Sequence, residues 1–255
     1  MQDLTTLLDI ALKAAKDAGV KILDIYENED FEKTVDFKAD DSPLTIADKA
    51  SHEVIQAALD ANAPEIPVMS EEGKELSYDE RKDWDLFWCV DPLDGTKEFI
   101  NRNGEFTVNI ALINNGYPIV GVIYAPVLDT VYCNDGIKSY MVKNGETTPL
   151  QVNNKSSERI AVQSKSHSSE EETKLLSNYD VADSISVGSS LKFCMVAEGK
   201  ADIYYRHGPT MEWDTAAGQA VLEGAGGSVS TLENERFFYN KENLRNNSFL
   251  CLGFK

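Results

Sequence analysis

The chain has 255 residues, 42% of them hydrophobic, and a formal net charge of −19, which allows one large domain or two small ones. This acidity argues against a nucleic-acid-binding surface, because phosphate contacts require clusters of lysine and arginine. It does not argue against a small phosphate substrate, because bound metal ions reverse the local charge.

The N-terminal part of the chain predicts two helices separated by a polar loop. Apolar residues recur at helical spacing over residues 4–26 and predict an amphipathic helix. Residues 37–45 (FKADDSPLT) are expected to form a loop, because Pro43 interrupts regular structure there. A second helix then opens at Thr45 or Asp48 and presents an alanine-rich face.

Two glutamates follow a short predicted strand. Residues 66–69 (IPVM) are apolar, and Ser70-Glu71-Glu72-Gly73 comes directly after them. Paired glutamates at a strand end ordinarily form a solvated loop. Cation binding is the alternative role, because a second acidic segment lies just downstream.

That second segment, residues 86–96 (LFWCVDPLDGT), is the centre of the chain. Its five leading apolar residues predict a strand buried on both faces. Asp91 and Asp94 then lie on a turn before a helix that Thr96 caps. Two like charges so close repel each other unless a cation lies between them, so the segment predicts a divalent metal site. An Asx-turn with a capping threonine is the simpler alternative.

An antiparallel meander is predicted next. Short β-type runs between residues 106 and 143 are separated by the hairpin signal Asn114-Asn115-Gly116 and end before Asn144-Gly145. The chain becomes polar around residues 151–158. We place a boundary there, between an N-terminal α+β subdomain (1–155) and a C-terminal α/β subdomain (156–255).

The C-terminal subdomain alternates strands with helices, as in an α/β unit. The predicted elements are strands at 160–162, 184–187, 201–205 and 248–253, and helices at 168–177, 191–198 and 213–223. Asp214 stands before an alanine-rich stretch, so its simplest role is that of a helix N-cap.

Cysteine spacing and the N-terminal residues indicate the compartment. The four cysteines are far apart and form no C-x-x-C pair: Cys89, Cys133, Cys194 and Cys251. We expect reduced, mostly buried thiols rather than a zinc site. The first ten residues contain no basic segment, and no apolar run has the length of a membrane span. We therefore expect a cytoplasmic protein that associates with the inner membrane only peripherally, if at all.

Acidic residues thus recur at the ends of predicted elements. They are Asp40, Asp41, Glu71, Glu72, Asp91, Asp94 and Asp214. Carboxylates suit Mg²⁺, a hard cation that prefers oxygen ligands. Two or more such ions activate water, orient a phosphate and neutralise a leaving alkoxide. An acidic cage of this kind therefore indicates phosphate ester hydrolysis.

Other catalytic classes lack their motifs. The sequence contains no G-x-S-x-G, no Walker lysine loop, no G-x-G-x-x-G and no H-E-x-x-H. Residues 224–227 (GAGG) are glycine-rich but close a predicted helix, so we expect a cap and turn there.

Three segments, in this order, resemble the signature of the lithium-sensitive, magnesium-dependent phosphatase superfamily that includes inositol monophosphatase. They are Ser70-Glu71-Glu72, Asp91-Pro92-Leu93-Asp94-Gly95-Thr96 and Trp213-Asp214-Thr215-Ala216-Ala217-Gly218. The resemblance covers essentially the whole chain. It implies an α/β (layered α+β) fold, a sandwich of alternating helix and sheet layers. Residues 38–45, 188–194 and 206–210 are further similar to the 3'(2'),5'-bisphosphate nucleotidases and their bacterial branch.

The resemblance implies two or three Mg²⁺ ions and inhibition by Li⁺. Glu71, Asp91 and the backbone carbonyl of Leu93 would bind the first ion. Asp91, Asp94 and Asp214 would bind the second.

By the same resemblance, Thr96 with Asp40 would orient and deprotonate the attacking water. A threonine alone is not a strong base, so Asp40 supplies the proton acceptor in this scheme. Asp48 is the rival partner of Thr96, because the inositol branch has an aspartate at that position.

Substrate contacts are also implied by the resemblance. They are Glu71, Leu93, Asp94, Gly95, Thr96, Ser164, His167, Gly188, Lys192 and Asp214. The backbone amides of Gly95 and Thr96 would meet the phosphate that is removed. By the resemblance, the nucleotide would be held by Ser164, His167, Gly188 and Lys192. Some relatives have threonine in place of Ser164, a change that keeps the hydroxyl.

The implied activity is Mg²⁺-dependent hydrolysis of adenosine 3',5'-bisphosphate, a by-product of sulfate activation, to AMP and phosphate. One alternative is a phosphatase of inositol monophosphate or a sugar phosphate; another is a metal- and nucleotide-binding protein without turnover. A bisphosphate carries a second anion that needs a cation away from the metals, so Lys192 and His167 favour the nucleotide. We expect a small-molecule substrate and no nucleic-acid partner, and the pattern fits a monomer and a homodimer equally.

Overall fold

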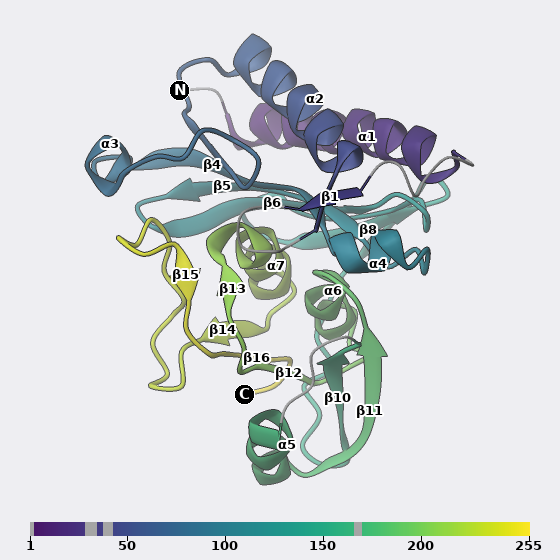
Figure 1. The fold of residues 1–255 in the computed structure, drawn as a ribbon. Coiled ribbons are helices and arrows are strands. Elements are labelled where there is room, and N and C mark those ends of the chain that lie inside the picture. Colours follow the sequence, from purple (N-terminus) through teal and green to yellow (C-terminus); the bar gives the residue numbers. More distant parts are fainter. Residues whose placement is uncertain (1–2, 29–34, 38–42, 166–169) are drawn as a thin grey trace.

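Helices and sheets alternate in layers in the computed structural model, which describes residues 3–28, 35–37, 43–165 and 170–255. The order is two helices, a seven-stranded sheet, two helices, a five-stranded sheet and a short outer helix (Figure 1). The predicted sandwich of alternating layers is confirmed. Within the described residues, none of the helices combines the length and the apolar composition needed to cross a bilayer.

The seven-stranded sheet is built from one continuous part of the chain. Its strands, in sheet order, are β3 (Val68–Ser70), β4 (Leu86–Asp94), β5 (Thr107–Asn114), β6 (Tyr117–Ala125), β7 (Thr130–Asn134), β8 (Ser139–Lys143) and β9 (Glu146–Pro149). β3 is parallel to β4, and every later pair is antiparallel. The meander predicted from the hairpin signals is therefore confirmed.

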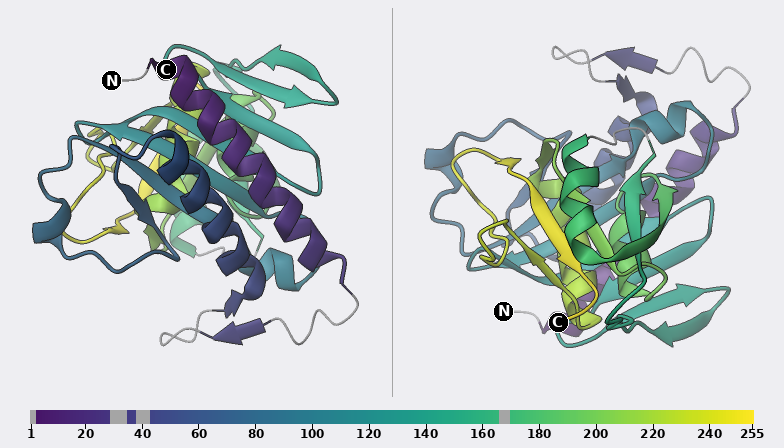
Figure 2. Two further views of the ribbon diagram at one scale, coloured as in Figure 1. Left: turned by 90° about the horizontal axis from the view of Figure 1, so that it is seen from above. Right: turned by 90° about the horizontal axis from the view of Figure 1, so that it is seen from below.

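Two long helices cover one face of this sheet. α1 (Leu4–Tyr26) and α2 (Ile46–Asn62) run side by side across it (Figure 2, left). Successive residues of β4 point to opposite faces. Trp88 and Val90 pack with the two helices, whereas Phe87 and Cys89 join the core on the other side. Burial on both faces explains why residues 86–90 are all apolar.

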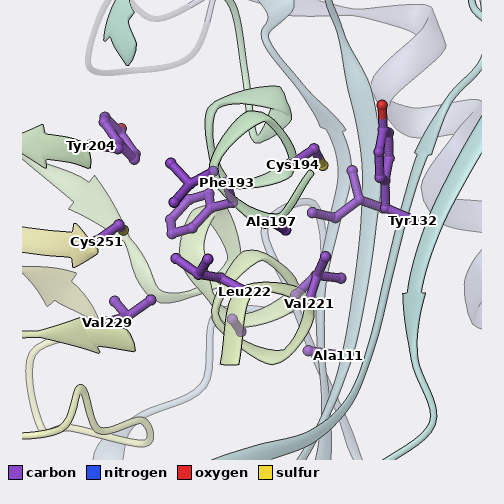
Figure 3. Close-up of a cluster of buried hydrophobic side chains, with 14 of the residues drawn as sticks. Ala111, Tyr132, Phe193, Cys194, Ala197, Tyr204, Val221, Leu222, Val229 and Cys251 are labelled. Atoms are coloured by element: carbon purple, nitrogen blue, oxygen red, sulfur yellow. The ribbon is translucent and has the colours of Figure 1, made fainter. Parts of the chain in front are cut away.

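The other face of the sheet packs against α6 (Leu191–Ala197) and α7 (Glu212–Gly224). These two helices lie between the two sheets, and their apolar side chains form one cluster with both, including Phe193, Val221 and Cys251 (Figure 3). All four cysteines of the chain are buried free thiols, as predicted.

The second sheet and the remaining elements complete the fold. Its strands, in sheet order, are β11 (Val181–Val187), β10 (Arg159–Ser164), β12 (Ile203–Arg206), β16 (Phe249–Leu252) and β14 (Ser228–Ser230). The other elements are the strand pairs β1 (Val35–Phe37) with β2 (Pro43–Thr45) and β13 (Thr210–Met211) with β15 (Arg245–Asn246), the helices α3 (Tyr78–Arg81), α4 (Thr96–Ile100) and α5 (Glu170–Leu176), and the 3-10 helix η2 (Ser177–Tyr179).

Several sequence-based boundaries need correction. Pro43 begins strand β2 instead of interrupting regular structure, and proline is compatible with a first strand position. The start predicted at residue 168 for the helix that becomes α5 lies outside the described residues. The sequence also gave no signal for α3 or for strands of two or three residues such as β13, β14 and β15, which are too short for a periodic pattern.

The subdomain boundary at residue 155 stays a prediction. The seven-stranded sheet ends at Pro149 and the five-stranded sheet begins at Arg159, on either side of it. A single hydrophobic cluster nevertheless joins residues of both parts, such as Phe87 and Phe249.

Close contact between α6 and α7 depends on Gly218. A Cβ atom placed on this residue would lie 2.4 Å from ring carbons of Phe193, far inside van der Waals contact. Gly218 belongs to the third signature segment, so one part of that motif serves helix packing.

We expect Gly218→Ala to lower the free energy of unfolding by about 1–3 kcal/mol, because the added methyl group overpacks the helix interface. Urea denaturation measures the loss. Adding Phe193→Leu makes room for the methyl group, so the double variant should lose less than the sum of the two single losses. Strict additivity would contradict this account of the glycine.

Candidate active site

A β-bulge at the end of β4 brings two aspartates to the same side of the molecule. Asp91 pairs with Asn109 on β5 and Asp94 pairs with Thr107, so β4 has one more residue than β5 between these pairs. Residues three apart in a regular strand face opposite sides, but one extra residue re-aims the side chain. The strand therefore continues through Asp94, whereas the sequence predicted a separate turn after Val90.

Three carboxylates from distant segments meet beside this bulge. Glu71, Asp91 and Asp214 each offer an oxygen, and these oxygens lie within 4.8 Å of one another. Glu71 follows β3 and is fixed by its backbone N–H, which donates to the carbonyl of Val90 at 3.1 Å. The interpretation of Glu71 as part of a solvated loop is therefore incomplete, because it is only half-buried yet faces this cluster.

Burial and mutual repulsion make this cluster electrostatically unfavourable without a cation. Burial raises the pKa of Asp91 well above its usual range, and the charges of Glu71, Asp94 and Asp214 raise it further. The pKa of Asp214 is also raised by burial and by Asp94 and Glu71. A divalent cation would reverse both effects, and an all-oxygen donor set suits Mg²⁺. The residues present therefore fit the predicted metal.

Asp214 is not an N-cap, as the sequence suggested, but the third residue of α7. Its Oδ2 accepts a hydrogen bond from the backbone N–H of Met211, the N-cap residue, at 2.8 Å. This contact reaches back over the first turn and fixes the side chain at the helix start.

Thr96 is likewise not a cap. The N-cap of α4 is Gly95, whose φ of 91° lies in the left-handed region that favours glycine. The hydroxyl of Thr96 instead donates to Oδ1 of Asp48 at 3.3 Å. Asp48 is 3% exposed, and its other oxygen caps α2 by accepting from the backbone N–H of Thr45 at 2.8 Å and its hydroxyl at 2.6 Å. The cap of α2 thus aims a carboxylate at Thr96.

One cavity of about 250 Å³ contains most of the predicted site and is lined by residues from the first turns of α4, α6 and α7. The predicted residues that line it are Glu71, Asp94, Gly95, Thr96, Ser164, Lys192 and Asp214. These side chains come from both sheets and from three helices. The cavity is therefore built across the layers of the fold.

Among the described residues, the predicted Asp91, Leu93 and Gly188 are not in the lining of this cavity. Leu93 is buried in the core, and its backbone N–H donates to Oδ1 of Asp91 at 3.0 Å. The backbone N–H of Gly188 donates to Glu105 at 2.8 Å, so a nucleotide contact by this glycine stays a prediction. Asp40 and His167 lie outside the described residues.

The cavity also contains residues that the sequence did not single out. They include Glu98, Ser189, Ser190, Phe193, Tyr204, Arg206 and Phe249. Ser189, Ser190, Phe193 and Arg206 belong to the two segments that resembled the nucleotidases, so a signal for them was present. Tyr204 and Phe249 carried none, because their spacing is that of ordinary core positions.

Three cationic side chains line the cavity: Lys97, which is exposed, and Lys192 and Arg206, which are not. Lys192 is buried and donates to the backbone carbonyl of Ser189. Burial lowers the pKa of its ammonium group, although Asp94 opposes this shift. The guanidinium of Arg206 lies 3.9 Å from Glu172, a buried carboxylate on α5.

The comparisons with known proteins agree with this geometry. The family model for the inositol monophosphatase family matches residues 3–249. The chain is 43% identical over 251 residues to 3'(2'),5'-bisphosphate nucleotidase CysQ of Salmonella typhimurium, covering 98% of each chain. It is 44% identical to the protein of that name from Shigella flexneri, with the same coverage.

Solved structures show the same fold. The crystal structure of CysQ from Bacteroides thetaiotaomicron, a bacterial member of the inositol monophosphatase family, matches with a TM-score of 0.85 and 44% identity over 96% of both chains. Inositol monophosphatase from Anabaena matches with a TM-score of 0.78 and 27% identity, covering 98% of this chain and 92% of that one.

The raised pKa values predict how stability depends on pH in the absence of metal. In the folded state the pKa values of Asp91 and Asp214 are well above the ordinary value of 3.8, which applies in the unfolded chain. At a pH between the two values the folded state holds more protons than the unfolded state. Stability therefore falls as the pH rises from 3.8 toward the raised pKa values. We expect the Tm measured in EDTA to fall as the pH is raised above 3.8, and to fall more steeply for the native protein than for Asp214→Asn.

Saturating Mg²⁺ should remove most of that difference in slope, because the cation takes the place of the bound protons. Parallel pH–Tm curves for the native protein and Asp214→Asn in EDTA would contradict the electrostatic account of the cluster.

Proposed function

Because the chain belongs to the inositol monophosphatase family, we propose that it is a magnesium-dependent 3'(2'),5'-bisphosphate nucleotidase that hydrolyses adenosine 3',5'-bisphosphate to AMP and phosphate. One observation carries this proposal: a single cavity presents a cluster of carboxylates for metal and two cations for a second anion. The identity of 43–44% over nearly the whole chain to proteins named as such nucleotidases supports it.

Bound metal ions would allow this acidic site to bind an anionic substrate. Glu71, Asp91 and Asp214, with Asp94 beside them, would hold Mg²⁺. When bound, Mg²⁺ supplies charge neutralisation for the phosphate and lowers the pKa of water. We propose two or three ions with the backbone carbonyl of Leu93 as a further ligand, and inhibition by Li⁺.

Thr96 orients the attacking water in this proposal. Its hydroxyl proton points to Asp48, so its lone pairs are left to accept a hydrogen bond from water. Thr96 accepts a proton from the water while its own hydroxyl proton passes to Asp48, because a threonine hydroxyl alone is too weak a base. The separation of 3.3 Å exceeds the usual value of about 2.8 Å, so the pair must close slightly for transfer. The assignment of Asp40 as the proton acceptor for Thr96, made from the sequence, stays a prediction.

Lys192 and Arg206 support a substrate with two phosphate groups. Both line the cavity that contains Asp94 and Asp214. A phosphate bound to metal leaves the second phosphate of the nucleotide to these cations, and arginine binds such a group in a bidentate manner. An inositol monophosphate has no second anion to occupy them. The four buried thiols support a reducing, cytoplasmic location, where this by-product of sulfate activation is removed.

The substrate is tested by steady-state phosphate release from adenosine 3',5'-bisphosphate and from inositol 1-phosphate, with Mg²⁺ and with EDTA. We expect a much higher kcat/KM for the nucleotide and no release in EDTA. Comparable values for both substrates would contradict the nucleotide assignment. No release from either would favour a binding protein without turnover.

Lys192→Met should raise the KM for adenosine 3',5'-bisphosphate by about 10-fold or more, because hydrogen bonds to charged groups contribute about 1.5–3 kcal/mol. Lys97→Met is the matched control: this lysine also lines the cavity but is exposed to solvent, so its loss should matter little. Equal effects of the two variants would argue against a specific contact at Lys192.

Thr96→Val should lower kcat about 10²–10⁴-fold with little change in Tm, because it removes the group that aligns water but keeps the shape. Thr96→Ser should retain most activity. Asp48→Asn and Asp40→Asn, measured side by side, identify the proton acceptor. We expect the larger loss for Asp48→Asn; full activity of that variant would return the role to Asp40.

A further inference from the structure

The side chain of Asp94 accepts hydrogen bonds from two buried polar residues, and neither belongs to a signature segment of the metal site. Asn109 on β5 is 1% exposed, and Ser190 at the start of α6 is 2% exposed. The backbone N–H and the hydroxyl of Ser190 each approach Oδ2 of Asp94 at 2.6 Å. The amide of Asn109 donates to the same oxygen at 3.2 Å.

The direction of each donor is fixed by its neighbours. The hydroxyl of Thr107 donates to Oδ1 of Asn109 at 3.0 Å, which turns the amide nitrogen of Asn109 toward Asp94. That nitrogen has two protons, and the second is donated to the Ser190 hydroxyl at 2.9 Å. The Ser190 hydroxyl then has one proton for two acceptors, Oδ2 of Asp94 at 2.6 Å and the backbone carbonyl of Asp214 at 3.0 Å. The carboxylate is the stronger acceptor of the two.

Ser190 also connects the two halves of the site. Its hydroxyl lies 3.0 Å from the backbone carbonyl of Asp214, on the first turn of α7. One side chain from the start of α6 thus contacts both Asp94 and the residue that supplies the carboxylate from α7. Among the described residues, the hydrogen bonds that the side chain of Asp94 accepts all reach Oδ2, so its other oxygen is left to the cavity.

We infer that Asn109 and Ser190 are positioning residues that fix the distance between the carboxylates of Asp94 and Asp214 and thereby set the affinity of the site for a divalent cation. The inference rests on the proposed function, because it concerns the same metal site. Outer partners of metal ligands restrict ligand rotation before the ion binds, so less conformational entropy is lost on binding. Their removal typically costs about 10–100-fold in metal affinity.

The chain offers a matched control. Asn134 and Ser139 form a second buried asparagine–serine pair, in which the amide of Asn134 donates to the Ser139 hydroxyl at 3.2 Å. This pair packs against Gly224, at the C-terminal end of α7, whereas Asp214 lies in its first turn. Ser139→Ala therefore removes a buried hydroxyl next to α7, as Ser190→Ala does, but at the opposite end of that helix from the metal site.

The test is isothermal titration of the full-length, metal-free protein with Mg²⁺ in the absence of substrate, accompanied by thermal unfolding. Ser190→Ala should weaken Mg²⁺ binding about 10-fold or more, and Ser190→Thr should restore most of the affinity. Ser139→Ala should change the Kd less than about twofold, whatever it does to Tm, since it has no contact with the ligands. Asn109→Ala combined with Ser190→Ala should be less than additive, because the two residues share one network.

The activity assay separates this inference from the proposed function. With the nucleotide as substrate, Ser190→Ala should need more Mg²⁺ for half-maximal rate but approach the native kcat at saturating Mg²⁺. If Ser190→Ala binds Mg²⁺ as tightly as the native protein, or if Ser139→Ala weakens binding equally, the positioning role is wrong while the proposed function stands. If the native protein neither binds Mg²⁺ nor releases phosphate, both fail.

Discussion

Repulsion among buried carboxylates is the constraint on which the site depends. Glu71, Asp91 and Asp214 are held within 4.8 Å of one another by three separate elements, and Asp94 adds to the charge that Asp91 and Asp214 experience. Such a group is unstable unless protons or a cation compensate it. The surrounding structure must therefore hold the carboxylates together in advance of the ion, which costs stability in return for affinity.

Several local devices provide that rigidity. The bulge in β4 re-aims Asp94, and the hydrogen bond from Met211 ties Asp214 to the first turn of α7. The cap of α2 places Asp48 against Thr96. In each case, the backbone hydrogen bonds at the end of a strand or the start of a helix also fix the functional side chain. The layered packing then brings these ends to a single cavity.

Much of this arrangement could be predicted from the sequence, and the rest could not for physical reasons. The meander was predictable because hairpin turns are encoded locally, and the strand at residues 86–90 because burial on both faces leaves a continuous apolar run. The bulge was not, since it depends on register with β5. The N-cap positions assigned to Thr96 and Asp214 were wrong, because the residue at which a helix begins depends on tertiary contacts. Asn109 and Ser190 are 81 positions apart, and only the fold shows that they meet.

The account stands on the claim that the carboxylate cluster is a divalent metal site. The most direct measurement is an anomalous difference map from a crystal of the protein soaked with Mn²⁺, a hard cation that carboxylates also bind. The account predicts at least one peak within coordination distance of Glu71, Asp91 and Asp214. A map in which this cluster stays empty at saturating Mn²⁺, or in which the ion binds only elsewhere, would contradict it.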